Sequence, residues 1–363
     1  MTTTSSRFAL ITGGAGFIGA SLAHRLASDG QRVVIFDNLS RQGGERNLQW
    51  LDQAHGELVR FERGDCRNIK ELEPLVQGAD QIFHFAAQVA VTSSLQDPRH
   101  DFEVNALGTL NVLEAVRKLD RRPPLLFTST NKVYGELSDI PLRRAGSRYQ
   151  PDDPALCAKG IDETRPLDFH SPYGCSKGGS DQYVLDYARS FGLSALVFRM
   201  SCIYGPHQHG NEDQGWVVHF LRRALANEPI TIFGDGLQVR DLLFIDDLVE
   251  AMLLGRDKAQ ELAGQAFNLG GGSANALSLL ELIERIGVLI GRLPEVRFEP
   301  SRKGDQRYYV SNTGKFARAT GFLPRVLVHD GLSRLHQWLT RPGHPLYGPP
   351  AALAVARRAE VTS

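Results

Sequence analysis

Short runs of apolar residues, rich in Val, Ile and Phe, recur through the N-terminal half of the chain and predict buried strands. In the longer segments between them, apolar residues repeat every three or four positions, as in a helix that packs one face on a sheet. The predicted strands are Phe8–Ile11, Val33–Phe36, Leu58–Phe61, Ile82–Phe85, Leu125–Phe127 and Ala195–Phe198, and the clearest helices are Phe17–Ser28, Asp101–Leu119 and Gly174–Phe191. This alternation predicts an α/β fold built on a doubly wound parallel sheet.

From about Met200 onward the alternation weakens, and glycine-rich stretches separate shorter helical segments. Ligands of an open parallel sheet bind beyond the carboxyl ends of its strands, so a smaller C-terminal α/β lobe would cover this edge and select the substrate. We expect residues 1–199 to form mainly the cofactor domain and residues 200–340 mainly the substrate lobe. The Pro- and Ala-rich segment 341–363 is expected to be a flexible tail.

The composition argues against proteins that bind nucleic acids or anionic membranes, and against disordered chains. With 363 residues the chain is long enough for one large or two closely joined domains. It carries 41 Lys and Arg against 41 Asp and Glu, so it lacks the positive field through which nucleic acids and anionic membranes are bound. The apolar and charged shares, 42% and 23%, are those of an ordinary globular protein.

Signals for targeting and for metal binding are weak. No apolar run is long enough to span a membrane and no signal peptide is recognisable, which favours a cytoplasmic location. The four cysteines are far apart and form no C-x-x-C pair, so we expect buried, reduced thiols. His207 and His209 have no further ligand at suitable spacing apart from Asp213, and we expect no metal site.

A glycine-rich segment, TGGAGFIG at residues 12–19, follows the first predicted strand and leads into the first helix. Its G-x-G-x-x-G spacing lets the backbone approach a pyrophosphate, and the N-terminus of the helix offers free N–H groups. Asp37 ends the second strand, where its carboxylate would accept hydrogen bonds from the ribose of adenosine and repel a 2′-phosphate. The arrangement predicts a Rossmann-like domain that binds NAD rather than NADP.

Tyr173 and Lys177 are four residues apart in a predicted helix and therefore share a face. The ammonium of Lys177 would stabilise the phenolate of Tyr173, and the pair would then remove a hydroxyl proton near neutral pH. Thr130 follows the strand Leu125–Phe127 and would present its hydroxyl to the same cleft. Taken alone, these residues also fit an exposed Tyr–Lys face and an ordinary strand-end turn.

The motifs together make the chain similar to the extended short-chain dehydrogenases/reductases, in the branch that modifies sugar nucleotides. The strings that carry the resemblance are TGGAGFIG, DNLS, GDCR, HFAAQ, VNALGTLNVLEA, STNKVYG, SPYGCSK, FGDGLQVRD, FNLGGG and RKGDQR. The resemblance implies an NAD domain, a C-terminal lobe that holds a nucleotide diphosphate, and Thr130, Tyr173 and Lys177 as the catalytic set. It also implies a homodimer or homotetramer that pairs through the helices at 101–119 and 174–191.

The motifs and the resemblance supply the other candidate residues. Cofactor contacts are expected from Gly13, Gly16, Phe17, Ile18, Gly19, Asp37, Asn38, Ser40, Arg41, Asp65, Cys66, Ala86, Ala87, Gln88, Asn105, Tyr173 and Lys177. Substrate contacts are expected from Gln88, Thr130, Asn131, Lys132, His170, Arg199, Ser201, Gln214, Arg240 and Arg307. Guanidinium groups suit diphosphate oxygens, although Arg240 and Arg307 also fit the role of surface charges.

The residues after Thr130 bear on the reaction. Dehydratases of this branch carry an acidic residue there, whereas this chain has Asn131 and Lys132, which favours redox inversion of a carbinol centre. Longer strings, including DNLSRQGGERNLQWL, LDFHSPYGCSKG and DQGWVVHF, resemble epimerases that act at C2 of CDP-linked dideoxyhexoses. The expected function is NAD-dependent inversion through a 2-keto sugar. A 4-epimerase of a UDP-, GDP- or dTDP-sugar, a 4,6-dehydratase and a non-catalytic NAD sensor are the alternatives, because the sequence alone does not determine the base.

Overall fold

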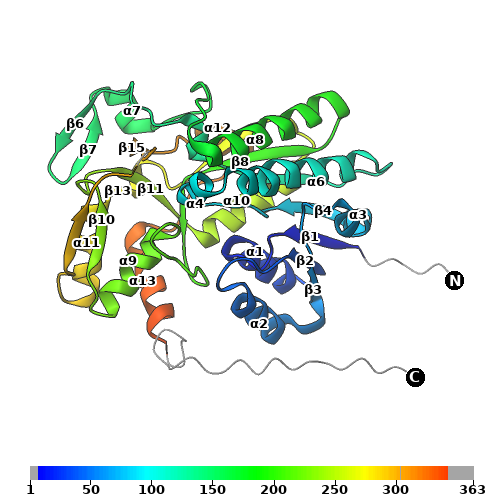
Figure 1. Cartoon of the computed structure of the whole chain (residues 1–363), viewed down its shortest axis with the longest axis horizontal. Coiled ribbons are helices and arrows are strands. Elements are labelled where there is room, and N and C mark those ends of the chain that lie inside the picture. The colour runs from blue at the N-terminus through cyan, green and yellow to red at the C-terminus, as the bar shows by residue number, and fades with distance from the viewer. Residues whose placement is uncertain (1–6, 303, 342–363) are drawn as a thin grey trace.

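The computed structural model describes residues 7–302 and 304–341, so the predicted tail lies outside the described residues beyond its first position. A seven-stranded sheet forms the centre of the larger domain, with strands in the order β12-β8-β5-β4-β1-β2-β3 (Figure 1). All neighbouring strands are parallel. Their bounds are β1 Phe8–Thr12, β2 Val33–Asp37, β3 Val59–Arg63, β4 Ala79–His84, β5 Leu125–Thr130, β8 Ala195–Met200 and β12 Ala266–Leu269.

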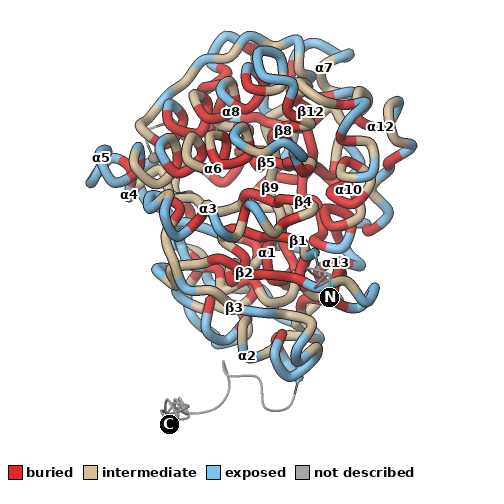
Figure 2. Tube along the Cα trace, turned by 90° about the vertical axis from the view of Figure 1, so that its right-hand side faces the viewer, coloured by how far each residue is buried: buried red, intermediate tan, exposed pale blue. Residues whose placement is uncertain are grey.

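Helices cover both faces of this sheet, and the strands lie buried between them (Figure 2). One face packs against α3 (Ile69–Gly78), α6 (Gly108–Arg117) and α8 (Ser171–Phe191). The other packs against α1 (Phe17–Ser28) and α10 (Ile245–Asp257), with α2 (Gly44–His55) beside α1. Successive strand residues point to opposite faces, so in β1 Leu10 joins the first layer while Ala9 and Ile11 join the second.

The smaller lobe covers the carboxyl edge of the sheet. One of its sheets contains β9 (Cys202–Tyr204), β11 (Val239–Phe244), β13 (Ala276–Ser278) and β15 (Tyr308–Tyr309), and β10 (Ile230–Phe233) pairs with β14 (Val296–Glu299). Its other elements are the hairpin β6 (Leu142–Ala145) and β7 (Arg148–Pro151), and the helices α7 (Pro154–Lys159), α9 (Trp216–Leu225), α11 (Leu279–Ile290), α12 (Gly314–Thr320) and α13 (Val328–Thr340).

The chain crosses between the two parts more than once. β12 and α10 come after residue 200 but belong to the large sheet and its cover. The hairpin β6–β7 comes earlier but packs on the smaller lobe, where Tyr149 N donates to Leu237 O (2.9 Å) and Arg148 forms an ion pair with Glu281 (2.5 Å). β12, α10 and the hairpin β6–β7 therefore pack with elements from the other side of residue 200.

The α/β fold and the six predicted strands are confirmed, and α1 has the predicted bounds. β12 was not predicted, because its four residues in a glycine-rich region give a short pattern. The predicted helix Asp101–Leu119 consists of α5 (Pro98–Phe102), a π-helical turn (Glu103–Leu107) and α6. Short helices also occur at Gly56–Leu58, Val91–Gln96 (α4), Asn131–Tyr134 and Ser273–Asn275.

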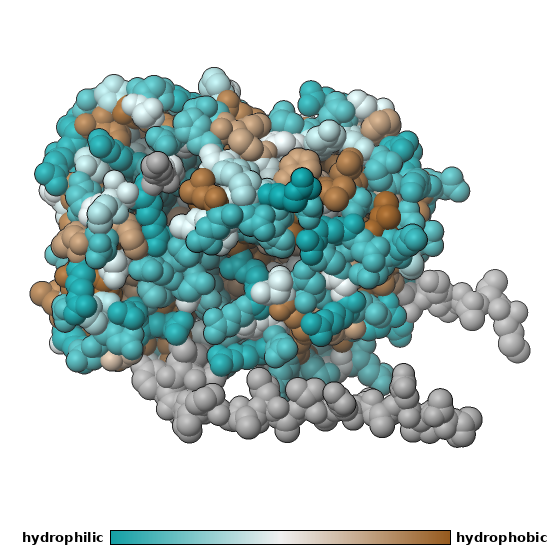
Figure 3. Space-filling view, in the orientation of Figure 1, coloured by the Kyte–Doolittle hydropathy of each residue, from teal (hydrophilic) through white to brown (hydrophobic). Residues whose placement is uncertain are grey.

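Hydrophilic residues cover most of the described surface in the view of Figure 3, with hydrophobic residues scattered among them. Within residues 7–302 and 304–341 no helix combines the length and the apolar character needed to cross a membrane. The four cysteines are free thiols, but only Cys66 is buried and Cys175 is exposed, so the expectation of buried thiols was wrong for Cys175.

Candidate active site

The glycine-rich loop lies between β1 and α1, at the carboxyl edge of the sheet. Gly13 has φ +68°, and a Cβ on it would lie 2.6 Å from the backbone nitrogen of Ala86. A Cβ on Gly19 would lie 2.6 Å from the carbonyl oxygen of Gly13, so α1 approaches this loop only with glycine there. α1 begins after Gly16 without a side-chain cap, which leaves the N–H groups of its first turn available to a pyrophosphate. The residues of that turn are Phe17, Ile18 and Gly19.

Asp37 ends β2 beside this loop. Its Oδ2 accepts a hydrogen bond from Ala15 N (3.1 Å) and its Oδ1 accepts one from Leu39 N (2.8 Å). Burial raises the pKa of Asp37, while these two bonds and the charge of Arg41 oppose the rise. The carboxylate is thus held rigidly at the place where the sequence predicts the adenosine ribose, and the loop and the acid fit NAD.

The loops after β2 and β3 are joined at this edge. Asn38 accepts a hydrogen bond from Ser40 N (2.9 Å) and donates to Asp65 Oδ2 (2.9 Å). Although burial opposes ionisation of Asp65, hydrogen bonds from Arg67 and Asn38 lower its pKa to about 2. Burial raises the pKa of both Tyr173 and Asp37, and the positive charge of Arg41 opposes the rise in each. Arg41 therefore interacts electrostatically with a catalytic residue and with the acid of the cofactor site.

Cys66 and the loop after β4 complete the predicted cofactor edge. Cys66 is buried, and burial raises the pKa of its thiol to about 12, so it is an uncharged packing group. Ala86 and Ala87 follow β4, with Ala86 against the glycine-rich loop. Asn105 binds the backbone of Gln88 on both sides, accepting from its N (2.9 Å) and donating to its O (3.0 Å). The side chain of Gln88 folds back onto its own loop.

Thr130 at the end of β5 and Tyr173 in the first turn of α8 come together through a side-chain hydrogen bond. Both are buried, with 8% of each residue exposed. Burial raises the pKa of Tyr173 to about 12, and the charge of Asp101 adds to the rise, whereas a hydrogen bond with Thr130 and the charge of Arg41 oppose it. Without cofactor the phenol is therefore protonated at neutral pH.

Lys177 lies one turn further along α8 and is also buried. Burial lowers the pKa of its ammonium to about 7, although the charges of Asp181 and Asp101 oppose the shift. Its Nζ lies 4.2 Å from the centre of the Phe127 ring on β5. The alternative of an exposed Tyr–Lys face is wrong, because Tyr173 and Lys177 both point into the protein.

A buried polar cluster supports these residues from α5 and the π-helical turn. Ser176 Oγ donates to Asp101 Oδ2 (2.5 Å), and Asn105 Nδ2 lies 3.2 Å from Asp101 Oδ1 and 3.0 Å from Ser176 Oγ. Asn105 thus joins the loop after β4 to this cluster. Sequence reasoning missed Asp101 and Ser176; the spacing of Asp101 and Asn105 was a signal, but only the packing of α8 shows its meaning.

Two cations, one after β5 and one on β11, share one carboxylate. Lys132, two residues after Thr130, donates to the Gly304 carbonyl (3.1 Å) and lies 3.5 Å from Asp305 Oδ1. Arg240 on β11 donates to the same oxygen (2.8 Å). Burial lowers the pKa of Lys132, with Asp305 opposing the shift. Two cations and one anion leave this cluster with an excess of positive charge.

Asn131 connects the catalytic strand to the smaller lobe. Its Nδ2 donates to Gln306 Oε1 (3.3 Å), and Gln306 Nε2 donates to the carbonyl of Gly135 (2.7 Å). Gln306 is fully buried, so the loop after β5 and the segment before β15 form one packed unit. The sequence motif RKGDQR contains Asp305 and Gln306, but sequence reasoning selected its last arginine instead.

Arg199 is buried in the core and paired with other side chains. Its Nε and Nη2 donate to the two carboxylate oxygens of Asp181 at 2.9 Å each, and Nη1 donates to Tyr134 Oη (3.1 Å). The side chains of Arg199 and Asp181 are 5% and 0% exposed. These bonds use three of its five N–H donors and the side chain is buried, so we leave Arg199 out of the substrate contacts.

Four other predicted substrate residues are not brought to Tyr173 by any contact described for them. Arg307 is exposed, with its guanidinium 5.6 Å from the centre of the Tyr149 ring. His170 is exposed beside Asp168 (3.0 Å). Ser201 donates to Asp241 Oδ1 (2.5 Å), and Gln214 is exposed in a turn closed by Asn211.

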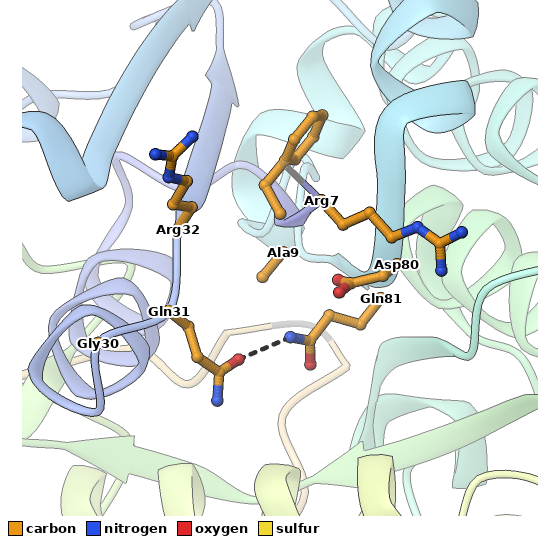
Figure 4. Close-up of a pocket in the computed structure, with 8 residues that line it drawn as sticks. Arg7, Ala9, Gly30, Gln31, Arg32, Asp80 and Gln81 are labelled. Atoms are coloured by element: carbon orange, nitrogen blue, oxygen red, sulfur yellow. Dashed lines mark hydrogen bonds between the residues drawn. The ribbon is translucent and has the colours of Figure 1, made fainter. Parts of the chain in front are cut away.

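A pocket and a pair of histidines lie away from the catalytic residues. A pocket of about 370 Å³ opens at the amino ends of β1 and β4, where Gln81 donates to Gln31 (2.8 Å) (Figure 4). It lies at the edge of the sheet opposite to the glycine-rich loop, away from the edge where parallel sheets bind ligands. His207 and His209 contact different residues, Trp50 and Asn47. Among the described residues no group of three or more His, Cys, Asp or Glu is placed to hold a metal ion.

Comparisons with known proteins agree with this geometry. Residues 9–270 match the NAD dependent epimerase/dehydratase family. CDP-paratose 2-epimerase of Salmonella typhi is 42% identical over 338 residues, which cover 91% of this chain and 98% of that protein. The structure of UDP-glucuronic acid 4-epimerase from Bacillus cereus, in complex with UDP-glucuronic acid and NAD, has a TM-score of 0.79 at 26% identity and covers 91% of this chain and 98% of that one.

A second solved structure extends the similarity to a dehydratase. DesIV, a dTDP-glucose 4,6-dehydratase from Streptomyces venezuelae with NAD bound, has a TM-score of 0.78 at 30% identity, and the match covers 91% of this chain and 96% of that one. The cofactor of the matched family is NAD, for which the glycine-rich loop and Asp37 are built. The chain therefore belongs to the NAD dependent epimerase/dehydratase family, as an NAD-dependent sugar-nucleotide epimerase.

Proposed function

We propose that this protein inverts C2 of CDP-paratose and so forms CDP-tyvelose. The observation that carries the reaction type is the buried set of Thr130, Tyr173 and Lys177 at the edge that holds the cofactor, with no acidic residue in the two positions after Thr130. The similarity to CDP-paratose 2-epimerase over nearly the whole of both chains favours this substrate over those of the 4-epimerases, which are more distant.

In the proposed reaction one proton moves from the C2 hydroxyl to Tyr173 and later returns. NAD, when bound, supplies the acceptor for the C2 hydride and afterwards the donor that returns it. Tyr173, once deprotonated, takes the proton of the C2 hydroxyl while the C2–O bond becomes a carbonyl, and it gives the proton back in the reverse step. Thr130 donates to the same oxygen, and Lys177 provides a positive charge next to the phenolate. Inversion results when the keto sugar turns its other face before reduction.

Elimination of water would need a further acid near the sugar. The residues after Thr130 are Asn131 and Lys132; the first is bonded to Gln306 and the second to the loop at Gly304 and Asp305. Asp305 is itself paired with Arg240, and although burial opposes its ionisation, the charges of Arg240 and Lys132 hold its pKa below the usual value. A carboxylate held in the ionised form does not donate a proton, which favours epimerisation over dehydration.

The excess positive charge of Lys132 and Arg240 is the feature we assign to the diphosphate of the substrate. Both are largely buried, and a guanidinium presents paired donors to phosphate oxygens. In this proposal the diphosphate competes with Asp305 for the same two cations. Gln88 and Asn131 lie on the loops nearest the catalytic residues and stay candidates for the sugar.

We also propose a homodimer that pairs through α5, α6 and α8. Large hydrophobic side chains are exposed on α5, on the π-helical turn before α6 and on α8. They are Phe102, Leu107, Tyr183 and Phe191, with exposures of 60%, 36%, 53% and 40%, and Leu95 on α4 at 55%. Burying such side chains against a second copy removes them from water.

The reaction is tested by incubating the purified protein with CDP-paratose in D₂O and following the sugar by NMR and mass spectrometry. Inversion at C2 without uptake of deuterium supports direct transfer and return of one hydride. Loss of the mass of water would instead identify a dehydratase. No change with CDP-paratose, together with conversion of UDP-glucose, would identify a 4-epimerase, and Tyr173→Phe serves as the inactive control.

A further inference from the structure

The loop that follows β9, residues 205–215, belongs to the smaller lobe but contacts the larger domain at α2. β9 pairs with β11, and Arg222 on α9 donates to the carbonyl of Gly210 (2.8 Å), which fastens the loop to its own lobe. Asn211 N donates to Gln214 O (2.8 Å) and closes a turn within the loop. The loop is therefore fixed to the smaller lobe by its own bonds, and from there it contacts the larger domain.

Two histidines of this loop contact α2 of the larger domain. The ring of His209 lies against the backbone of Gly43, where a Cβ would overlap it, and its Nε2 lies 3.3 Å from Oδ1 of Asn47. The ring of His207 stacks on Trp50, with centroids 3.5 Å apart and 18° between the planes. His207 has φ +66°, a conformation that is unfavourable for residues other than glycine and persists only where surrounding contacts fix it.

Asn47 connects His209 to the glycine-rich loop. Its Nδ2 donates to the carbonyl of Ala15 (3.0 Å), and because a carbonyl oxygen only accepts, Oδ1 of Asn47 faces His209. His209 must then carry its proton on Nε2 and donate to Asn47. Burial and the charges of Arg46 and Arg222 lower the pKa of His209 to about 4, so the ring is neutral and suited to this single donor role.

The connection continues to the predicted ribose site, because Ala15 N donates to Asp37 Oδ2 (3.1 Å). We propose that His209 and Asn47 are positioning residues that latch the smaller lobe over the adenosine side of the NAD site and slow the release of NAD. The proposal rests on NAD as the cofactor, and it does not depend on which sugar nucleotide is inverted.

An enzyme that oxidises and then reduces the same carbon must keep its reduced cofactor bound between the two steps. Release of the reduced cofactor before the keto sugar has turned would leave an oxidised product and end the cycle. The contact between His209 and Asn47 is separate from Thr130, Tyr173 and Lys177, so it can govern retention of the cofactor without altering proton transfer.

The test measures the exchange of bound radiolabelled NAD against an excess of unlabelled NAD. We expect His209→Ala to release NAD about five- to tenfold faster than the wild type, as the loss of one hydrogen bond of ordinary strength implies. Asn47→Ala also loses the bond to Ala15 and should release NAD at least as fast as His209→Ala. His209→Gln keeps a donor toward Asn47 and should restore slow release, whereas His209→Leu has no donor and should not. His329→Ala, exposed at the start of α13, is the control and should behave as the wild type.

A double variant separates the latch from a general loosening of the fold. Without Asn47 the proposed acceptor is gone, so adding His209→Ala to Asn47→Ala should not speed release further. Additive effects of the two substitutions would overturn the proposal, and so would wild-type release from His209→Ala. A chain that binds no NAD at all would overturn the cofactor assignment together with the latch, and activity on the sugar is needed for none of these measurements.

Discussion

Ser176 donates a hydrogen bond of 2.5 Å to the carboxylate of Asp101, which is fully buried. Ser176 directly precedes Lys177 on α8, so this bond places a negative charge beside the catalytic helix. This charge opposes the burial that lowers the pKa of Lys177, and it adds to the burial that raises the pKa of Tyr173. Asp101 is thus a positioning residue with an electrostatic effect on each member of the Tyr–Lys pair.

Asp101→Asn keeps the shape of this side chain and removes its charge. The pKa values of Tyr173 and Lys177 should both fall, because a negative charge that favours the protonated form of each is lost. The whole pH profile of kcat should therefore move to lower pH, by about one unit. Asp186→Asn, on the exposed face of α8, is the control, and an unshifted profile for Asp101→Asn would contradict the electrostatic role.

Tyr173→Phe should lower kcat by at least about a hundredfold, because the proton acceptor for the substrate hydroxyl is lost. NAD should still bind, since the glycine-rich loop and Asp37 are unchanged. Comparison of NAD content and turnover in the two proteins checks both statements. A variant that keeps its activity would favour a non-catalytic role for Tyr173.

The same variant allows the ionisation of Tyr173 to be measured. In the NAD-free protein its pKa of about 12 keeps the phenol protonated, chiefly because it is buried. Bound NAD brings a cationic nicotinamide ring, which should lower this pKa. The absorbance of tyrosinate in the wild type minus that in Tyr173→Phe, followed against pH with and without NAD, should show titration at lower pH in the holoenzyme.

Lys177→Met should change stability in a pH-dependent way. The folded pKa of Lys177 is about 7, against 10.5 without burial, so the unfolded chain binds more protons between these values. The cost of burying the ammonium is complete below pH 7 and disappears as the pH rises toward 10.5. The stability gained by Lys177→Met over the wild type should be largest near pH 6 and should shrink steadily toward pH 10, as checked by urea unfolding of the NAD-free proteins. A constant difference would contradict the lowered pKa.

Arg199→Ala tests whether the buried ion pair of this arginine with Asp181 stabilises the fold. It leaves the carboxylate of Asp181 buried and unpaired, which should cost about 3–5 kcal/mol of unfolding free energy. Arg307→Ala, an exposed site, should change stability by less than about 0.5 kcal/mol. Equilibrium unfolding in urea checks both. If Arg199→Ala were as stable as the wild type and raised only the KM for the sugar nucleotide, the residue would be a substrate contact as its motif suggests.

The sequence by itself determined six of the seven strands of the large sheet, and it indicated NAD as the cofactor. The patterns of β1, β2, β3, β4, β5 and β8 are local, because each strand is a short apolar run bounded by a helix or a turn. The glycine-rich loop depends on residues that are adjacent in the chain, and the same is true of Tyr173 and Lys177 on one helix face. Such features need no knowledge of distant contacts.

Only the tertiary structure decided which polar residues work together. Arg199 and Arg240 look alike in sequence, but one is paired inside the core with Asp181 while the other shares Asp305 with Lys132. Asp101 acquires its role only when α8 packs against α5. His209 reaches Asn47 across a separation of 162 residues. The physical reason is that burial, ion pairing and pKa depend on neighbours in space, and these neighbours come from segments that no local pattern connects.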